Sequence, residues 1–249
     1  MIIGAIVAGG TGRRMGTAVP KQFLKLGDRT ILLRSVDAFL KCDEIDTVIV
    51  GVPKEWVMYT KQLMDEAGYG ENRKRVRVTE GGANRNETMW LISEYAVSKL
   101  KASDSTIMVT HDAVRPFVTE DIIRRTIKML QSADQKTGVT AAIPASDTIL
   151  RVGDNSEVVE APKRINMMHA QTPQTVYLGT WRRIYKKLSA ADREFRTDIS
   201  GMYIGAGLRV KVVDGAVGNS KITTPEDLEA ARRRVLDEAE KPVIAPDGE

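Results

Sequence analysis

Short, continuously apolar runs alternate with helical patterns along most of this 249-residue chain. A strand that is apolar at every position has no solvated face, which is typical of parallel strands covered on both sides by helices. The expected strands are Ile2–Ala8, Thr47–Val52, Arg75–Thr79, Thr106–Thr110, Val139–Pro144 and Leu208–Val213. The expected helices are Ile31–Leu40, Glu55–Ala67, Glu87–Leu100, Glu120–Ser132, Leu178–Leu188 and Glu226–Glu238. The pattern therefore predicts an α/β fold with a mostly parallel central sheet flanked by helices, and a ligand site at the carboxyl ends of the strands.

A glycine-rich, cationic loop follows the first expected strand. After Ala8 the sequence reads Gly9-Gly10-Thr11-Gly12-Arg13-Arg14-Met15-Gly16, and Pro20-Lys21-Gln22-Phe23 comes soon after. Glycines permit close backbone approach, so successive N–H groups can converge on phosphate oxygens while the arginines and Lys21 supply countercharge. The loop predicts a nucleotide site. Taken alone, it could also be a plain strand-to-helix turn with solvated arginines.

Two familiar phosphate-binding motifs do not fit this loop. A P-loop requires Lys-Ser or Lys-Thr after its last glycine, and no glycine here is followed in that way. The dinucleotide fingerprint would require glycine where Met15 stands, and an acidic residue where Gly51-Val52-Pro53 ends the next strand. Neither a P-loop ATPase nor an NAD-dependent enzyme is favoured.

The charged residues, the single cysteine and the apolar runs indicate which classes of binding partner to expect. The 37 Lys and Arg exceed the 33 acidic residues by four, a mild excess that suits an anionic small molecule better than nucleic acid. The lone Cys42 excludes an internal disulfide, fits a reducing compartment, and is expected to be inert packing. The apolar start Ile2–Ala8 is too short to span a bilayer. We therefore expect a cytoplasmic protein that binds neither nucleic acid nor membrane.

Three polar segments follow strands of the predicted sheet. The glycine loop follows Ile2–Ala8, Gly81-Gly82 follows Arg75–Thr79, and His111-Asp112 follows Thr106–Thr110. Because the carboxyl ends of parallel strands meet at one edge of a sheet, we expect these three segments to gather there.

One segment, residues 145–171, breaks the alternation. It reads as two short strands around a Gly153-Asp154-Asn155 turn, with little core of its own. An isolated hairpin is marginally stable in water, so this segment is expected to pack against something else, although it could fold back on its own domain. We expect one domain over residues 1–240, with a frayed tail at 241–249.

The ordered combination of motifs resembles the cytidylyltransferases that activate polyol phosphates. The resemblance runs from Ile3 to about Val235 and includes Ala8–Gly16 with Pro20–Phe23, Gly81–Asn86, His111–Phe117, Gln171–Gln174 and Lys221–Leu228. It implies a Rossmann-like nucleotidyltransferase fold, CTP and a polyol phosphate as substrates, and Mg²⁺ as cofactor. It also implies a homodimer in which the segment 145–171 is an arm exchanged between subunits.

The resemblance also implies residue roles. Three cations would act in catalysis: Arg14, Lys21 and Lys221. The nucleotide would contact Ala8, Gly9, Gly10, Thr11, Gly12, Gly82, Arg85, Thr88 and Asp112. The acceptor would contact Arg115, Thr148, Arg164, Thr172 and Asp198, and Asp112 would also hold Mg²⁺. Such a reaction needs positive charge more than a general base, because the acceptor phosphate is already anionic.

Simpler structural roles are open for several of these residues. Lys21 could be a solvated loop lysine. Asn84 or Asn86 could cap the helix that follows, and Asp198 could do the same near residue 199. Thr119 is the expected cap of Glu120–Ser132, which leaves Asp112 free for a ligand.

Two branches of the resembled family compete. Gly9-Gly10, Gln171–Thr175 and Leu188–Asp192 look more like enzymes that use D-ribitol 5-phosphate, which we favour at this stage. The alternative acceptor is 2-C-methyl-D-erythritol 4-phosphate, used in isoprenoid precursor synthesis, and Ile199-Ser200 departs from the ribitol pattern. A nucleotide sensor without catalysis is disfavoured because Lys21 and Lys221 are both present.

Overall fold

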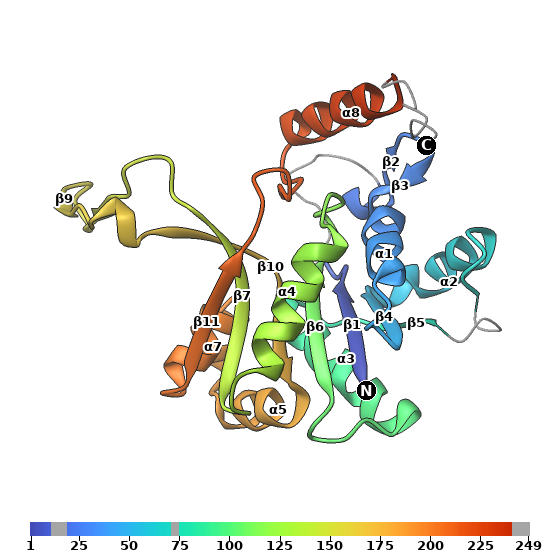
Figure 1. Ribbon diagram of the computed structural model, residues 1–249, viewed down its shortest axis with the longest axis horizontal. Coiled ribbons are helices and arrows are strands. Elements are labelled where there is room, and N and C mark those ends of the chain that lie inside the picture. Colours follow the sequence, from blue (N-terminus) through green and yellow to red (C-terminus); the bar gives the residue numbers. More distant parts are fainter. Residues whose placement is uncertain (11–18, 71–74, 241–249) are drawn as a thin grey trace, which may run out of the picture.

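The computed structural model describes residues 1–10, 19–70 and 75–240 (Figure 1). Its centre is a seven-stranded sheet in the order β11-β7-β10-β6-β1-β4-β5. The strands are β1 (Ile2–Val7), β4 (Thr47–Val52), β5 (Val76–Glu80), β6 (Ile107–Asp112), β7 (Thr137–Pro144), β10 (Met168–Tyr177) and β11 (Arg209–Asp214). Neighbours pair in parallel except at β10, which runs antiparallel to β6 and β7. The mostly parallel sheet is confirmed, and each of the six expected strands is present.

Helices cover both faces of this sheet. They are α1 (Ile31–Lys41), α2 (Val57–Glu66), α3 (Arg85–Leu100), α4 (Glu120–Gln131), α5 (Leu178–Lys187), α6 (Ala190–Phe195), α7 (Ile199–Gly205) and α8 (Pro225–Glu240). Along β1, Ile3 and Ala5 pack with α3, α5 and α7, whereas Ile6 packs with α1 and α4. Side chains of a strand alternate between faces, so continuously apolar strands fill two cores, one on each side.

Side-chain caps set several helix starts. The hydroxyl of Thr119 accepts from Ile122 N at the start of α4, and Asn84 accepts from Glu87 N at the start of α3. Asp198 accepts from Gly201 N at the start of α7. The capping roles considered for Asn84, Thr119 and Asp198 are therefore confirmed.

The two-stranded excursion is confirmed as a hairpin of β8 (Arg151–Val152) and β9 (Val158–Glu160), which projects away from the sheet (Figure 1). Its predicted boundary was wrong at one end. Residues 168–171 belong to β10, where Met168 pairs with Pro144 of β7 and Gln171 is buried. We refer to residues 145–167 as the arm. Apolar side chains are exposed along it and at its end, namely Leu150, Val152, Val158, Val159, Ile165 and Met168.

Two further expectations concern the reactivity of Cys42 and the presence of membrane-spanning helices. Cys42 is buried in the core under α1, and burial, assisted by a hydrogen bond to Glu44, raises the pKa of its thiol to about 12. Such a thiol stays protonated and unreactive. Across the described ranges, no helix combines the length and apolar character needed to cross a membrane.

Candidate active site

The strand exits meet as predicted, around a cavity of about 310 Å³. Its walls come from the ends of β1 and β6, the start of α3 and the segment before α8. The lining residues are Val7, Ala8, Gly9, Gly10, Lys21, Gln22, Ala83, Asn84, Arg85, Asp112, Ala113, Val114 and Lys221. Residues that are distant in sequence thus form one pocket, which we call the site pocket.

Close packing against α3 explains why Gly9 must be glycine. A Cβ at this position would lie 2.6 Å from Oγ1 of Thr88. That hydroxyl is fully buried, accepts a hydrogen bond from Gly82 N at 3.1 Å and donates to Asn84 O at 2.9 Å. Thr88 therefore packs against Gly9 and is hydrogen-bonded to Gly82, and its direct contact with a base stays a prediction.

Gln22 is a site residue that sequence reasoning quoted within a motif without giving it a role. Its Nε2 donates to the carbonyl oxygens of Ala8 at 2.7 Å and Gly10 at 3.1 Å, and the side chain is buried. These bonds tie the entry of the glycine loop to the 3₁₀ helix η2 (Lys21–Phe23). The signal available in the sequence was an amide side chain immediately after a candidate catalytic lysine, in Pro20-Lys21-Gln22-Phe23.

The two candidate catalytic lysines lie at the same pocket. Lys21 is buried rather than solvated, and its Nζ donates to Ile222 O at 2.8 Å. Ile222 packs against Leu228 of α8, and its N–H donates to Val114 O at 2.9 Å. This packing fixes the segment that carries Lys221, whose Nζ lies 2.8 Å from Oδ2 of Asp112.

Asp112 is the centre of a cluster of cations. Its Oδ1 pairs with Nε of Arg85 at 3.0 Å, and its Oδ2 pairs with Lys221 and, at 3.8 Å, with Nε of Arg115. Burial by itself disfavours the charged carboxylate, but Arg85, Lys221 and Arg115 outweigh burial and hold the pKa of Asp112 well below its usual value. Asp112 is therefore ionised at neutral pH and is not a general acid.

The donor set fits a magnesium ion bound mainly by nucleotide. Within the described part of the chain, no group of three or more His, Cys, Asp or Glu side chains is placed to hold a metal. Asp112 offers one carboxylate at the pocket. Mg²⁺ is commonly bound through one or two carboxylates together with substrate phosphates, so a single carboxylate is sufficient.

Arg115 and Thr172 lie behind Asp112. Arg115 donates through Nη1 to Asn219 O at 2.9 Å. The Thr172 hydroxyl is hydrogen-bonded to Nδ1 of His111 at 2.9 Å and accepts from Asp112 N at 3.2 Å. His111 is fully buried, and burial lowers its pKa to about 4. These groups support Asp112, and the predicted contacts of Arg115 and Thr172 with an acceptor stay predictions.

Asp198 is linked to the site pocket indirectly. Its Oδ2 accepts from Nε2 of Gln174 at 3.0 Å, and Oε1 of Gln174 accepts from Nη2 of Arg85 at 3.3 Å. Thr148 and Arg164 are instead exposed on the arm, where Arg164 donates to Ser146 O at 3.2 Å. Neither residue lines the pocket of its own chain, and the hairpin of the arm projects away from the sheet (Figure 1).

Three predicted site residues, Thr11, Gly12 and Arg14, lie outside the described residues. The glycine loop is therefore described only as far as Gly10, where the backbone already faces the site pocket.

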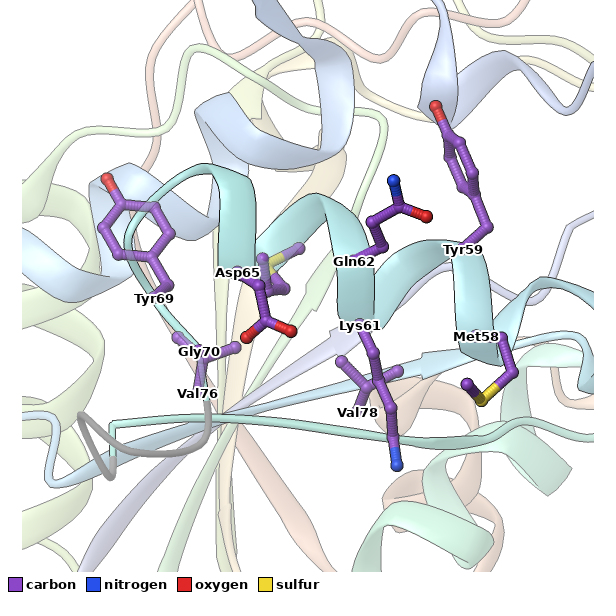
Figure 2. A pocket seen from close by; sticks show the side chains of 10 residues that line it. Met58, Tyr59, Lys61, Gln62, Asp65, Tyr69, Gly70, Val76 and Val78 are labelled. Carbon is purple, nitrogen blue, oxygen red and sulfur yellow. The ribbon is translucent and has the colours of Figure 1, made fainter.

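A larger hollow, of about 670 Å³, lies between α2 and the edge strand β5 (Figure 2). Met58 and Lys61 of α2 and Val78 of β5 are among its lining residues. Its lining shares no residue with the site pocket and includes none of the predicted site residues that the structure describes. The smaller pocket is therefore the better candidate for the active site, because it alone of these two gathers the charged groups that phosphate chemistry needs.

Comparisons with known proteins agree with this geometry. The sequence profile of the IspD family, described as 2-C-methyl-D-erythritol 4-phosphate cytidylyltransferase, matches residues 2–236. The solved structure of the Francisella tularensis 2-C-methyl-D-erythritol 4-phosphate cytidylyltransferase is similar, with a TM-score of 0.75 and 26% identity over 94% of this chain and 99% of that one. The solved structure of the Anaerococcus prevotii 4-diphosphocytidyl-2C-methyl-D-erythritol synthase is also similar, with a TM-score of 0.75 and 24% identity over 95% of this chain and 96% of that one.

The profile spans every strand of the central sheet and every described residue of the site pocket. The resemblance seen in the motifs is thereby confirmed. The chain belongs to the IspD family and is a cytidylyltransferase.

Proposed function

We propose that this enzyme transfers CMP from CTP to 2-C-methyl-D-erythritol 4-phosphate. The family profile that matches residues 2–236 carries this proposal, because it is described by that reaction. The sequence motifs alone favoured D-ribitol 5-phosphate. The comparisons support the methylerythritol acceptor better.

The reaction forms a bond between a phosphate oxygen of the acceptor and the α-phosphorus of CTP, and it breaks the bond from that phosphorus to pyrophosphate. The breaking bond leaves its electron pair on the pyrophosphate oxygen. An acceptor phosphate is anionic at neutral pH and needs no base. This agrees with the pocket lining, whose described residues include no histidine, and with the burial of His111 behind it.

Lys21 and Lys221 supply the positive charge that this transfer requires. Both line the pocket, close to the backbone of Gly9 and Gly10. Cations and backbone dipoles that are fixed before reaction stabilise charge that develops at the α-phosphate. Asp112 holds Lys221 and Arg85 in place through its two oxygens. When bound, Mg²⁺ would neutralise phosphate charge, with Asp112 as its protein ligand.

We further propose that the arm completes the acceptor site of a second copy. The arm exposes apolar side chains, and Ile165 at its end is 90% exposed in the single chain. Short hairpins are marginal alone, so burial against a partner would stabilise this one. In such a homodimer Thr148 and Arg164 would reach the partner's acceptor phosphate.

The test is pyrophosphate release with CTP, measured as kcat/KM for the two acceptors. We expect the methylerythritol compound to be the better substrate. A preference for D-ribitol 5-phosphate would reject this acceptor while keeping the cytidylyltransferase activity. The reaction with UTP in place of CTP serves as the nucleotide control.

A further inference from the structure

Gln174 is a buried amide that the proposed mechanism does not use. It lies on β10, paired with Thr110 of β6 on one side and Thr140 of β7 on the other, and is 1% exposed. The register between β10 and β7 shifts between Ala170 and Gln174. A polar side chain in the middle of a sheet must satisfy its hydrogen bonds inside the protein, so its partners indicate its role.

Both ends of the Gln174 amide are occupied. Its Oε1 accepts from Nη2 of Arg85 at 3.3 Å and from Ile199 N at 3.2 Å. Its Nε2 donates to Oδ2 of Asp198 at 3.0 Å, to Oγ1 of Thr140 at 3.2 Å and to Oγ of Ser200 at 3.4 Å. The oxygen thus faces a cation and the nitrogen faces a carboxylate. An uncharged side chain can serve both only if it carries a donor and an acceptor side by side.

These bonds complete a continuous row of charged and polar groups. Lys221 pairs with Asp112, Asp112 pairs with Arg85, Arg85 donates to Gln174, and Gln174 donates to Asp198. The row holds the guanidinium of Arg85 at Nε and Nη2, and Nη1 donates to Sδ of Met89 at 3.2 Å, so its plane is fixed as well as its position. The row begins in the site pocket and ends at the residue that caps α7.

We propose that Gln174 is a positioning residue for cytidylyl transfer. It fixes Arg85 against Asp112 on the nucleotide side and fixes Asp198 on the acceptor side, so that both halves of the site keep one geometry. The acceptor half of this inference rests on the proposed function. The nucleotide half rests on Arg85, which lines the site pocket.

Two substitutions separate this role from simple packing. Gln174→Met keeps the length of the side chain but removes the hydrogen bonds that Gln174 makes to Nη2 of Arg85 and to Oδ2 of Asp198. Gln174→Glu keeps the shape and the acceptor for Arg85, but places an oxygen beside Oδ2 of Asp198. That new carboxyl would face Arg85 from α3, with Asp112 beyond it, and Asp198 before α7. Arg85 favours the charged form of this carboxyl, whereas repulsion from Asp198 and burial favour its protonated form, which can donate to Asp198 as the amide does.

The control is Thr175→Val. Thr175 is the next residue on β10, is equally buried, and donates to Oγ1 of Thr126 in α4 on the opposite face of the sheet. This change removes a buried hydrogen bond from the same strand without touching the row. CTP binding without acceptor is measured by calorimetry, and pyrophosphate release is measured with acceptor, both between pH 6 and 8 and below the thermal midpoint of each variant.

We expect Gln174→Met to weaken CTP binding about tenfold and to raise the KM for acceptor, because hydrogen bonds to two charged groups are lost. Gln174→Glu should bind CTP weakly at pH 8 and regain affinity toward pH 6. Thr175→Val should stay within twofold of wild type. Affinity and KM within twofold of wild type in both folded Gln174 variants would overturn the inference. If the wild type binds CTP but releases no pyrophosphate, the proposed function fails, and the calorimetric comparison still decides the role of Gln174.

Discussion

The site pocket and the arm were both predicted to carry site residues, but they differ in how their side chains are used. In the pocket, Asp112 contacts three cations and Lys21 donates to a backbone oxygen. On the arm, Thr148 and Arg164 are exposed and apolar side chains face solvent. The described lining of the pocket therefore comes from a single chain. The arm makes sense as part of a site only if a second copy supplies the rest.

The largest effect is expected from Lys221→Gln, which preserves reach and removes the charge. We expect turnover to fall by about 100-fold, because a fixed charge near the reacting phosphate is lost. The fold should survive, since Asp112 keeps Arg85 and Arg115 as partners. Initial rates of pyrophosphate release and thermal midpoints measure the two properties separately.

Lys41→Gln, at the exposed last residue of α1, is the control for this substitution. It removes the same charge from the protein without changing the site pocket, so its turnover should match wild type. If Lys221→Gln also keeps turnover within twofold of wild type, Lys221 has no part in the chemical step.

The arm can be tested by complementation between two damaged copies. Arg164→Ala should lower turnover at least about tenfold if Arg164 holds an acceptor phosphate of the partner. Mixing it with Lys221→Gln should restore activity, because a heterodimer would contain one site with both residues intact. Refolding the two variants together, then assaying the mixture against each parent alone, measures this directly. A fully active monomer in size-exclusion chromatography would reject the arrangement.

The pocket was predictable from sequence because its chemistry sits at strand exits. Continuous apolar strands followed by Gly9-Gly10, Gly81-Gly82 or His111-Asp112 require only that parallel strands end at one edge. The structure confirms this gathering at the site pocket. The roles of Thr148 and Arg164 could not be derived in this way. They follow from the family resemblance alone, because neither residue lines the site pocket of its own chain.

Strand β10, in contrast, could not be predicted from the sequence pattern. It is a central strand, yet its sequence carries Gln171, Thr172, Pro173 and Gln174 in place of an apolar run. Those polar groups are satisfied by distant residues, such as Asn219 for Gln171 and Arg85 for Gln174. Local patterns cannot show such pairing, so both the strand and the row of groups through Gln174 needed the structure.

The last expected effect is on stability rather than on turnover, and it also distinguishes the pocket from the arm. Burial lowers the pKa of His111 to about 4, below the 6.5 of an exposed ring. As pH falls below about 6.5, the unfolded chain takes up a proton that the native ring does not accept until about pH 4. This difference should therefore lower native stability by up to about 3 kcal/mol between pH 6.5 and 4, and the contribution of His111 alone should be constant below pH 4.

Only two histidines exist in the chain, which makes this prediction easy to check. Urea unfolding at several pH values should show a smaller decline for His111→Gln than for wild type between pH 6.5 and 4, since the variant has no ring to protonate. His169→Gln, at the exposed end of β10 beside the arm, is the matched control and should follow wild type. Equal slopes for His111→Gln and wild type would mean that the ring behind Asp112 already accepts its proton in the native state. The ring of His111 would then be accessible to solvent, as the side chains of the arm are.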